Sequence, residues 1–171
     1  DSPDRLLGKD PALSAIMRGV VKRVHDQGTV RRWRIDMTKR SLREEVVDAS
    51  SHEYPTIDPL RSGLPYRNAY VGTMRPDEWW TSGTVRLDMD SGTRDAYQGR
   101  TNQQLGEPVF VPRQGGGTDE GWLLVESLDG DSGLTSLMVF NASHVAAGPI
   151  AEATLRHHLP FSVHGTWVPG A

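Results

Sequence analysis

Val85-Arg86-Leu87-Asp88, followed by Met89-Asp90-Ser91-Gly92 and by a polar stretch over residues 93–97, decides the fold that this sequence predicts. Apolar and polar side chains alternate along the first four residues, as they do in a strand with one buried face. Asp and Gly favour the tight turn that comes next, and the polar stretch fits a return strand. The segment is therefore predicted to form a β-hairpin.

The same pattern occurs in two other places. Trp33-Arg34-Ile35-Asp36 precedes a turn and a return strand over residues 41–47, and Leu137-Met138-Val139-Phe140-Asn141 precedes a turn and a return strand over residues 150–155. From Asp36 to Asp88 is 52 positions, and from Asp88 to Asn141 is 53. A repeat of about 50 residues with about four short strands is typical of a β-propeller blade. A β-sandwich is the alternative that this pattern leaves open.

The chain divides into two parts by the period of its apolar residues. Residues 1–29 are predicted to be an irregular lead-in with a short amphipathic helix, because apolar residues recur there at steps of three and four. From residue 30 onward the period is two, so residues 30–171 are predicted to be blades of a single all-β propeller domain. The chain begins at Asp1 rather than at methionine, which fits a processed or incomplete piece.

Composition excludes several classes of function. The 171-residue chain has a formal net charge of −3 and scattered arginines, so nucleic acid is not expected as a partner. The chain has no cysteine, which excludes disulfides, thiolate metal sites and a cysteine nucleophile. No apolar run is long enough to span a membrane and no signal peptide is visible, so we expect a cytoplasmic protein, of bacterial origin. Contact with a membrane surface and the oligomeric state cannot be predicted from this pattern.

Three polar residues occupy corresponding places in the repeat. Glu53, Glu107 and His164 each open the unit that follows a return strand, and the first strand of a blade lines the propeller axis. Two carboxylates and an imidazole that converge on an axis are unfavourable unless a metal or another charge is present. The alternative for His164 is a hydrogen-bonded histidine in a terminal strand, which the alternation of residues 161–167 predicts.

Several motifs resemble the carotenoid cleavage oxygenase family, which includes lignostilbene dioxygenases and the retinal pigment epithelium isomerase. They are Glu53-Tyr54-Pro55-Thr56-Ile57-Asp58-Pro59, Gly106-Glu107-Pro108-Val109-Phe110-Val111-Pro112-Arg113 and Pro160-Phe161-Ser162-Val163-His164-Gly165-Thr166-Trp167. The match extends over about residues 33–169. The resemblance implies a seven-bladed propeller with Fe(II) on its axis, held by four histidines, three of which are bonded to glutamates. It implies that His164 is the last iron ligand and that Glu53 and Glu107 are two of the three glutamates.

The resemblance also implies a reaction. Enzymes of this kind cleave a conjugated carbon–carbon double bond of a hydrophobic substrate with O2 and form two carbonyl products, without an organic cofactor. Neutral imidazole suits iron, and a glutamate behind each ring fixes which nitrogen faces the metal. The substrate and the bond that is cleaved cannot be predicted. An isomerase on the same scaffold and a non-catalytic binding propeller are the alternatives.

The other histidines of the chain do not lie in ligand motifs; they are His25, His52, His144, His157 and His158. The remaining three iron ligands and the third glutamate are therefore expected in earlier blades. On this interpretation the chain is the C-terminal three or so blades of a protein about three times as long. Alone it would have an open sheet edge and one iron ligand, and it would be inactive.

Overall fold

The computed structural model describes residues 28–76, 78, 80–160 and 162–170, and the predicted helix within residues 1–29 falls almost entirely outside them. The described residues form eleven β-strands and two short 3-10 turns, in agreement with the all-β prediction. The strands are β1 (Val30–Asp36), β2 (Ser41–Asp48), β3 (His52–Thr56), β4 (Asn68–Thr73), β5 (Gly83–Asp88), β6 (Arg94–Gln98), β7 (Gln103–Leu105), β8 (Val109–Pro112), β9 (Gly121–Asp129), β10 (Thr135–Asn141) and β11 (Pro149–Thr154). The 3-10 turns are η1 (Pro59–Arg61) and η2 (Val145–Ala147).

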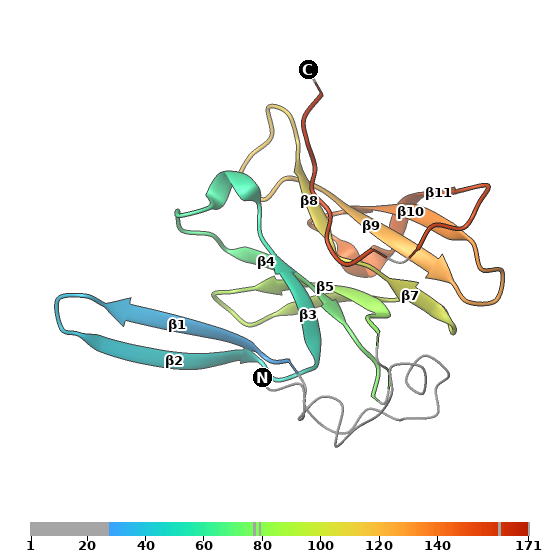
Figure 1. Ribbon diagram of the computed structural model, residues 1–171. Helices are drawn as coiled ribbons and strands as arrows, with labels where there is room; N and C mark the ends of the chain where they lie inside the picture. Colours follow the sequence, from blue (N-terminus) through green and yellow to red (C-terminus); the bar gives the residue numbers. More distant parts are fainter. Residues whose placement is uncertain (1–27, 77, 79, 161, 171) are drawn as a thin grey trace.

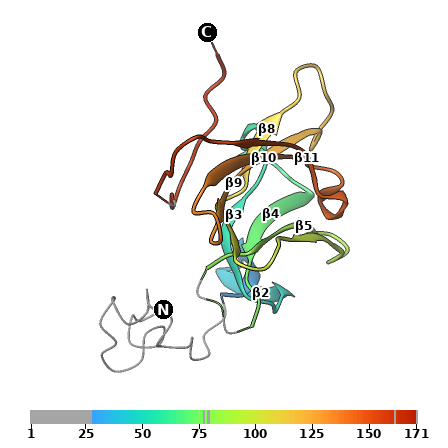
Figure 2. The same cartoon turned by 90° about the vertical axis from the view of Figure 1, so that its right-hand side faces the viewer.

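The strands form two antiparallel sheets and a separate hairpin (Figures 1 and 2). The first sheet has the order β3-β4-β5-β6, which is the order of a simple meander. The second has the order β11-β10-β9, and β7 and β8 both pair with the remaining edge of β9. β1 and β2 pair only with each other among the described strands, and their hairpin extends away from the two sheets (Figure 1).

The two sheets pack face to face through an apolar layer. Tyr70 of β4 lies against Phe110 of β8 with ring centroids 5.4 Å apart, and Tyr97 of β6 lies 5.1 Å from Phe140 of β10. The opposite face of the first sheet forms a second core with the base of the β1–β2 hairpin. The first sheet is thus packed on both faces, as a propeller blade is, with β3 at one edge, and the second sheet has β7 and β8 at one edge.

The acidic residues at the strand ends hold the turns that the sequence predicts. Asp36, Asp88 and Asp129 each accept two backbone N–H bonds through one carboxylate oxygen, from the residues two and three positions ahead. Asn141 accepts one such bond from Ser143 at 2.9 Å. Such Asx turns reverse the chain locally, so the three predicted hairpins form as β1–β2, β5–β6 and β10–β11.

Two details differ from the sequence prediction. The described residues 162–170 form no strand, although their alternation predicts one. A strand requires a backbone ladder, and this segment is instead held by the side chains of Glu107 and Glu126. The sequence pattern also predicts His157 and His158 on the outer return strand, but they lie beyond the end of β11 at Thr154.

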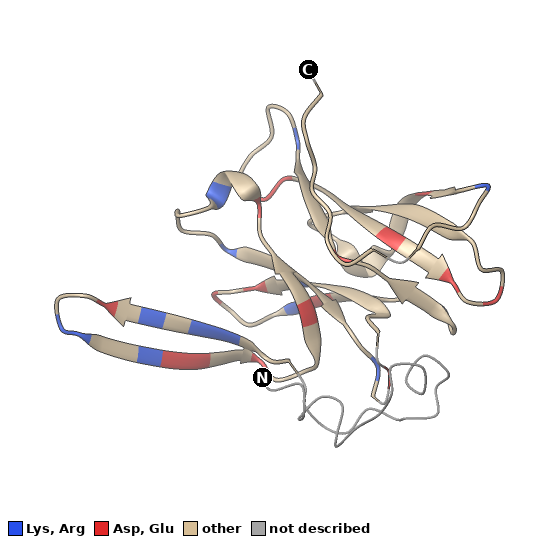
Figure 3. Ribbon diagram, in the orientation of Figure 1, with Lys and Arg blue, Asp and Glu red and all other residues tan. Residues whose placement is uncertain are grey.

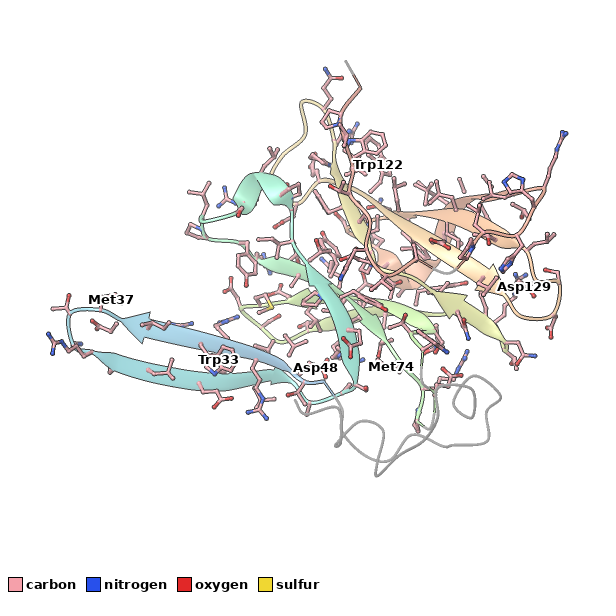
Figure 4. The ribbon with its side chains drawn as sticks, in the orientation of Figure 1. Trp33, Met37, Asp48, Met74, Trp122 and Asp129 are labelled. Atoms are coloured by element: carbon pink, nitrogen blue, oxygen red, sulfur yellow. The ribbon has the colours of Figure 1, made fainter. Side chains whose placement is uncertain are left out.

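Surface charge is mixed in sign over the described residues. Figure 3 shows basic and acidic residues interspersed along the β1–β2 hairpin and over both sheets. The hairpin also exposes Trp33 (61%) and Met37 (82%), both labelled in Figure 4. Within the part of the chain that the structure describes, no helix is long and apolar enough to cross a membrane.

Candidate metal centre

Glu107 lies at an interruption of one sheet edge, between β7 and β8. Leu105 pairs with Ser127, and Val109 pairs with Leu124. Four steps along this edge therefore face three steps along β9, so that one additional residue forms a bulge. Bulges turn a side chain away from the direction that strict alternation would give it. The Glu107 side chain is consequently directed off the sheet edge and is 18% exposed.

Glu53 lies at the same kind of irregularity in the neighbouring sheet. Glu53 pairs with Gly72, and Thr56 pairs with Tyr70, so three steps along β3 face two along β4. The side chain of Glu53 is exposed, and among the described residues no hydrogen bond to its carboxylate is found. Both predicted glutamates thus occur at one-residue bulges on equivalent edges of two successive sheets.

His164 lies in the extended C-terminal segment, directly beside Glu107. The two oxygens of Glu107 contact this segment at successive residues. Oε2 accepts the Gly165 backbone N–H at 2.8 Å, and Oε1 lies 3.4 Å from Nδ1 of His164. The first contact is a strong, charge-assisted bond, whereas the second is at the long end of the hydrogen-bond range. Together they orient Nδ1 of His164 toward the carboxylate, and no hydrogen bond or ion pair of Nε2 with the other described residues is found.

Tyr54, the residue after Glu53, is the other group in contact with the imidazole. The ring centroids of Tyr54 and His164 are 6.0 Å apart, with an angle of 87° between the planes, which is an edge-to-face arrangement. Burial and the nearby carboxylates of Glu53 and Glu107 raise the pKa of the Tyr54 phenol above its ordinary value. The phenol therefore stays neutral between two carboxylates that come from different sheets.

A second carboxylate anchors the segment before His164. Ser162 donates a hydrogen bond from Oγ to Oε2 of Glu126 on β9. Further back, the Thr135 hydroxyl donates to the Leu159 carbonyl and accepts the Leu159 N–H, both at 3.1 Å. The segment that carries His164 is therefore fixed on both sides of the histidine.

A small hollow of about 130 Å³ lies next to Glu107. Its lining includes Thr56 and Ile57, Val109 and Phe110 of β8, and Trp167 of the C-terminal segment. The hollow connects the edges of the two sheets and is too small for a long polyene; on this chain alone it is a site for a small group at most.

The described residues offer a single imidazole, that of His164, as a metal ligand beside Glu107. Among them, no group of three or more His, Asp or Glu side chains could hold a metal ion. One imidazole is present instead, and a carboxylate behind Nδ1 leaves Nε2 as the ligating nitrogen, which is the usual arrangement for a metal-bound histidine. The roles predicted for His164, Glu53 and Glu107 remain predictions; an imidazole with a carboxylate at Nδ1 has the chemistry of a single ligand to a ferrous ion.

The other histidines are placed differently. His52 is buried with 2% of its side chain exposed, and its Nε2 lies 3.3 Å from Asp48, labelled in Figure 4. His158 contacts the carbonyl of Gly133 through Nδ1 at 2.9 Å. His25 lies outside the described residues. Sequence reasoning did not identify Tyr54 or Glu126, because their roles depend on strand register rather than on a local pattern.

Comparison with known proteins gives consistent relatives. The family described as retinal pigment epithelial membrane protein matches residues 3–169. The apocarotenoid-15,15'-oxygenase of Synechocystis sp. is 31% identical over 145 residues, which are 83% of this chain and 30% of that enzyme. The resveratrol cleavage oxygenase 1 of Chaetomium globosum is 25% identical over 166 residues, which are 92% of this chain and 27% of that enzyme.

The structural comparison agrees. The crystal structure of cobalt-substituted Synechocystis apocarotenoid oxygenase matches with a TM-score of 0.80 and 30% identity, over 85% of this chain and 31% of that one. The predicted propeller fold is therefore confirmed as a partial, open propeller, and the β-sandwich alternative is wrong. The chain spans less than a third of the length of each of these three proteins.

Proposed function

The chain belongs to the carotenoid cleavage oxygenase family, matched under the description retinal pigment epithelial membrane protein. On that premise we propose that it is part of a non-haem iron(II) dioxygenase. The enzyme would cleave a conjugated carbon–carbon double bond of a carotenoid, apocarotenoid or stilbene with O2. The 171 residues would supply one iron ligand and two supporting glutamates, and a preceding part of the protein would supply the rest.

The contact between Glu107 and His164 carries this proposal. When Nδ1 carries the proton and donates its N–H to the Glu107 carboxylate, the lone pair of the imidazole lies on Nε2, where a metal can bind. The Gly165 N–H bond to the other oxygen keeps the carboxylate from rotating away. The contacts of Glu107 with Nδ1 of His164 and with the Gly165 N–H thus set both the tautomer and the direction of the imidazole ring.

Glu53 would act in the same way on a histidine from outside this chain. It occupies a bulge equivalent to that of Glu107, and its carboxylate is exposed to the space beside β3. Two anionic residues near the site would also offset the charge of a divalent ion bound by neutral imidazoles. When bound, ferrous iron would supply the O2 chemistry, in which each oxygen atom ends in one of two carbonyl products.

The relatives suggest which substrates to test first. The Synechocystis relative is named for an apocarotenoid and the Chaetomium globosum relative for resveratrol, a stilbene in its chemistry. An apocarotenal is our first choice because the Synechocystis enzyme has the higher identity over most of this chain. A cytoplasmic, bacterial setting is part of the same proposal.

The test is product analysis on the full-length protein that contains this chain. The protein would be incubated with an apocarotenal or with a hydroxylated stilbene under ¹⁸O2, beside His164→Ala and the control His158→Ala. We expect O2 uptake equal to substrate loss, label in both carbonyl products, and loss of both in His164→Ala only. Isomerised substrate without O2 uptake would instead support the isomerase alternative. Binding without turnover would support a non-catalytic propeller, and either result would overturn the proposal.

A further inference from the structure

The backbone of Tyr54 is in a conformation that is unfavourable for an aromatic residue. Its φ angle is +55°, in the left-handed region that glycine, asparagine and aspartate adopt most readily. Among the described residues, three other non-glycine residues share this region: Arg40, Asn102 and Asp119. Those three lie in turns, whereas Tyr54 lies inside strand β3. A residue held in this way against its preference suggests a functional constraint.

The local structure explains how the conformation is maintained. The additional residue of the β3 bulge lies between Glu53 and Thr56. These are the nearest residues on either side of the bulge that pair with β4. Gly72 on β4 faces the bulge without a side chain. A Cβ at Gly72 would lie 3.4 Å from Cδ2 of Tyr54 and 2.8 Å from Cγ2 of Thr81, so only glycine leaves this space. The bulge and the glycine together aim the Tyr54 ring away from the direction that alternation would give it.

The ring is thereby brought against His164. The side chain of His164 is 75% exposed, and the residue lies in a segment without a backbone ladder, so few contacts restrict the rotation of the imidazole. Within the described structure its hydrogen-bond contact is with Glu107 at Nδ1, and its ring contact is with the edge-to-face ring of Tyr54. A single long hydrogen bond fixes a point of the ring but not its plane. A perpendicular aromatic ring fixes the plane.

We propose that Tyr54 is a positioning residue for His164, which holds the imidazole plane so that Nε2 points to the metal. The inference rests on the proposed function, since it gives His164 the role of a ligand. Glu107 and Tyr54 come from different sheets, so the ligand is oriented from two blades at once. A histidine that is ordered before the metal arrives binds it more tightly, because less conformational freedom is lost on binding.

The experiment uses cobalt(II) as the probe, because a cobalt-substituted form exists for the Synechocystis relative. Metal-free full-length protein would be titrated with cobalt(II), and both the affinity and the d–d absorption spectrum would be recorded. The variants are Tyr54→Leu and Tyr54→Asn, which remove the aromatic ring; asparagine tolerates the left-handed backbone and so separates ring loss from misfolding. Tyr54→Phe retains the ring, and Arg40→Gly relieves the same backbone conformation at a turn on the β1–β2 hairpin.

We expect Tyr54→Leu and Tyr54→Asn to bind cobalt(II) about 2- to 13-fold more weakly, the size of one edge-to-face aromatic pair, with a changed spectrum. Tyr54→Phe should restore the affinity and Arg40→Gly should match wild type. If Tyr54→Leu and Tyr54→Asn both bind cobalt(II) with the affinity and the spectrum of the wild-type protein, this inference is overturned and the proposed function still stands. A wild-type protein without a 1:1 cobalt site would overturn both.

Discussion

Replacing Glu107 with glutamine is the sharpest perturbation of the site, since it keeps the shape and removes the charge. The carboxylate now receives two donors, the Gly165 N–H at 2.8 Å and Nδ1 of His164 at 3.4 Å. Glutamine has one acceptor oxygen and one donor nitrogen, so it can satisfy only one of the two. If its oxygen keeps the Gly165 bond, its NH2 group faces Nδ1 and favours the tautomer that carries the proton on Nε2.

That tautomer cannot bind a metal through Nε2, so the affinity must fall. Removing a partner of this kind typically weakens metal binding about 10- to 100-fold. The corresponding loss of binding free energy is about 1.4–2.7 kcal/mol. Glu107→Asp keeps the charge but shortens the side chain by one methylene. The shorter carboxylate cannot reach both the Gly165 N–H and Nδ1 of His164, so it should weaken metal binding as well.

The assay is an anaerobic iron(II) titration of metal-free full-length protein against a chromogenic chelator. Glu152→Gln is the matched control, since Glu152 is exposed on β11 and carries the same change of charge. Wild-type iron affinity in Glu107→Gln, with the control also unchanged, would refute the role given to this carboxylate.

Three further predictions concern the scaffold. Asp95 accepts two backbone N–H bonds of η2 at 2.8 and 2.9 Å and so joins the two sheets; Asp95→Ala should lower the unfolding free energy in urea by about 2–4 kcal/mol. Hydrogen bonds from Arg67 and from backbone N–H groups lower the pKa of Asp88 to about 2. Its stabilising effect should be complete above the unfolded pKa of about 3.9 and be lost as the pH falls toward 2, so the destabilisation measured for Asp88→Asn should shrink over that window. Gly72→Ala should lower the unfolding free energy by about 1–3 kcal/mol through contact with Thr81, and Thr81→Ser should recover part of the loss.

Each of these has its own contrary outcome. An Asp95→Ala protein as stable as wild type would mean that solvent replaces the two bonds to η2. A pH-independent effect of Asp88→Asn would mean that Arg67 and the backbone N–H groups do not favour the ionised carboxylate in the folded state. Equal stability of Gly72→Ala with and without Thr81→Ser would place the strain somewhere other than at the Thr81 methyl group.

Local sequence predicts the hairpins because each one is closed by its own residues. Asp36 and Asp88 accept N–H groups only two and three positions ahead, so the turn depends on nothing distant. By contrast, β7 has three residues, too few for a period to be recognised, and it ends before Glu107, the residue with which the sequence analysis opens the unit. The strand predicted for residues 161–167 has the right alternation, but its pairing partner is not determined by alternation.

The site shows the same division between local and distant information. Glu107 and His164 are 57 positions apart, and each residue is identified by its own motif without reference to their contact. Tyr54 lies within the same motifs, yet neither its left-handed backbone nor its contact with His164 follows from residue type. Both arise from the register shift between β3 and β4, which is fixed by the packing of whole strands.

The most direct test of the account is the iron content of the full-length protein, purified as wild type and as His164→Ala, with His158→Ala as the control histidine change. We predict about one iron per wild-type chain and per His158→Ala chain, and much less in His164→Ala, because one of the ligating nitrogens is lost. Equal iron in His164→Ala and wild type would contradict the assignment of His164 as a ligand. Absence of iron from all three proteins, even after reconstitution with iron(II), would contradict the dioxygenase function itself.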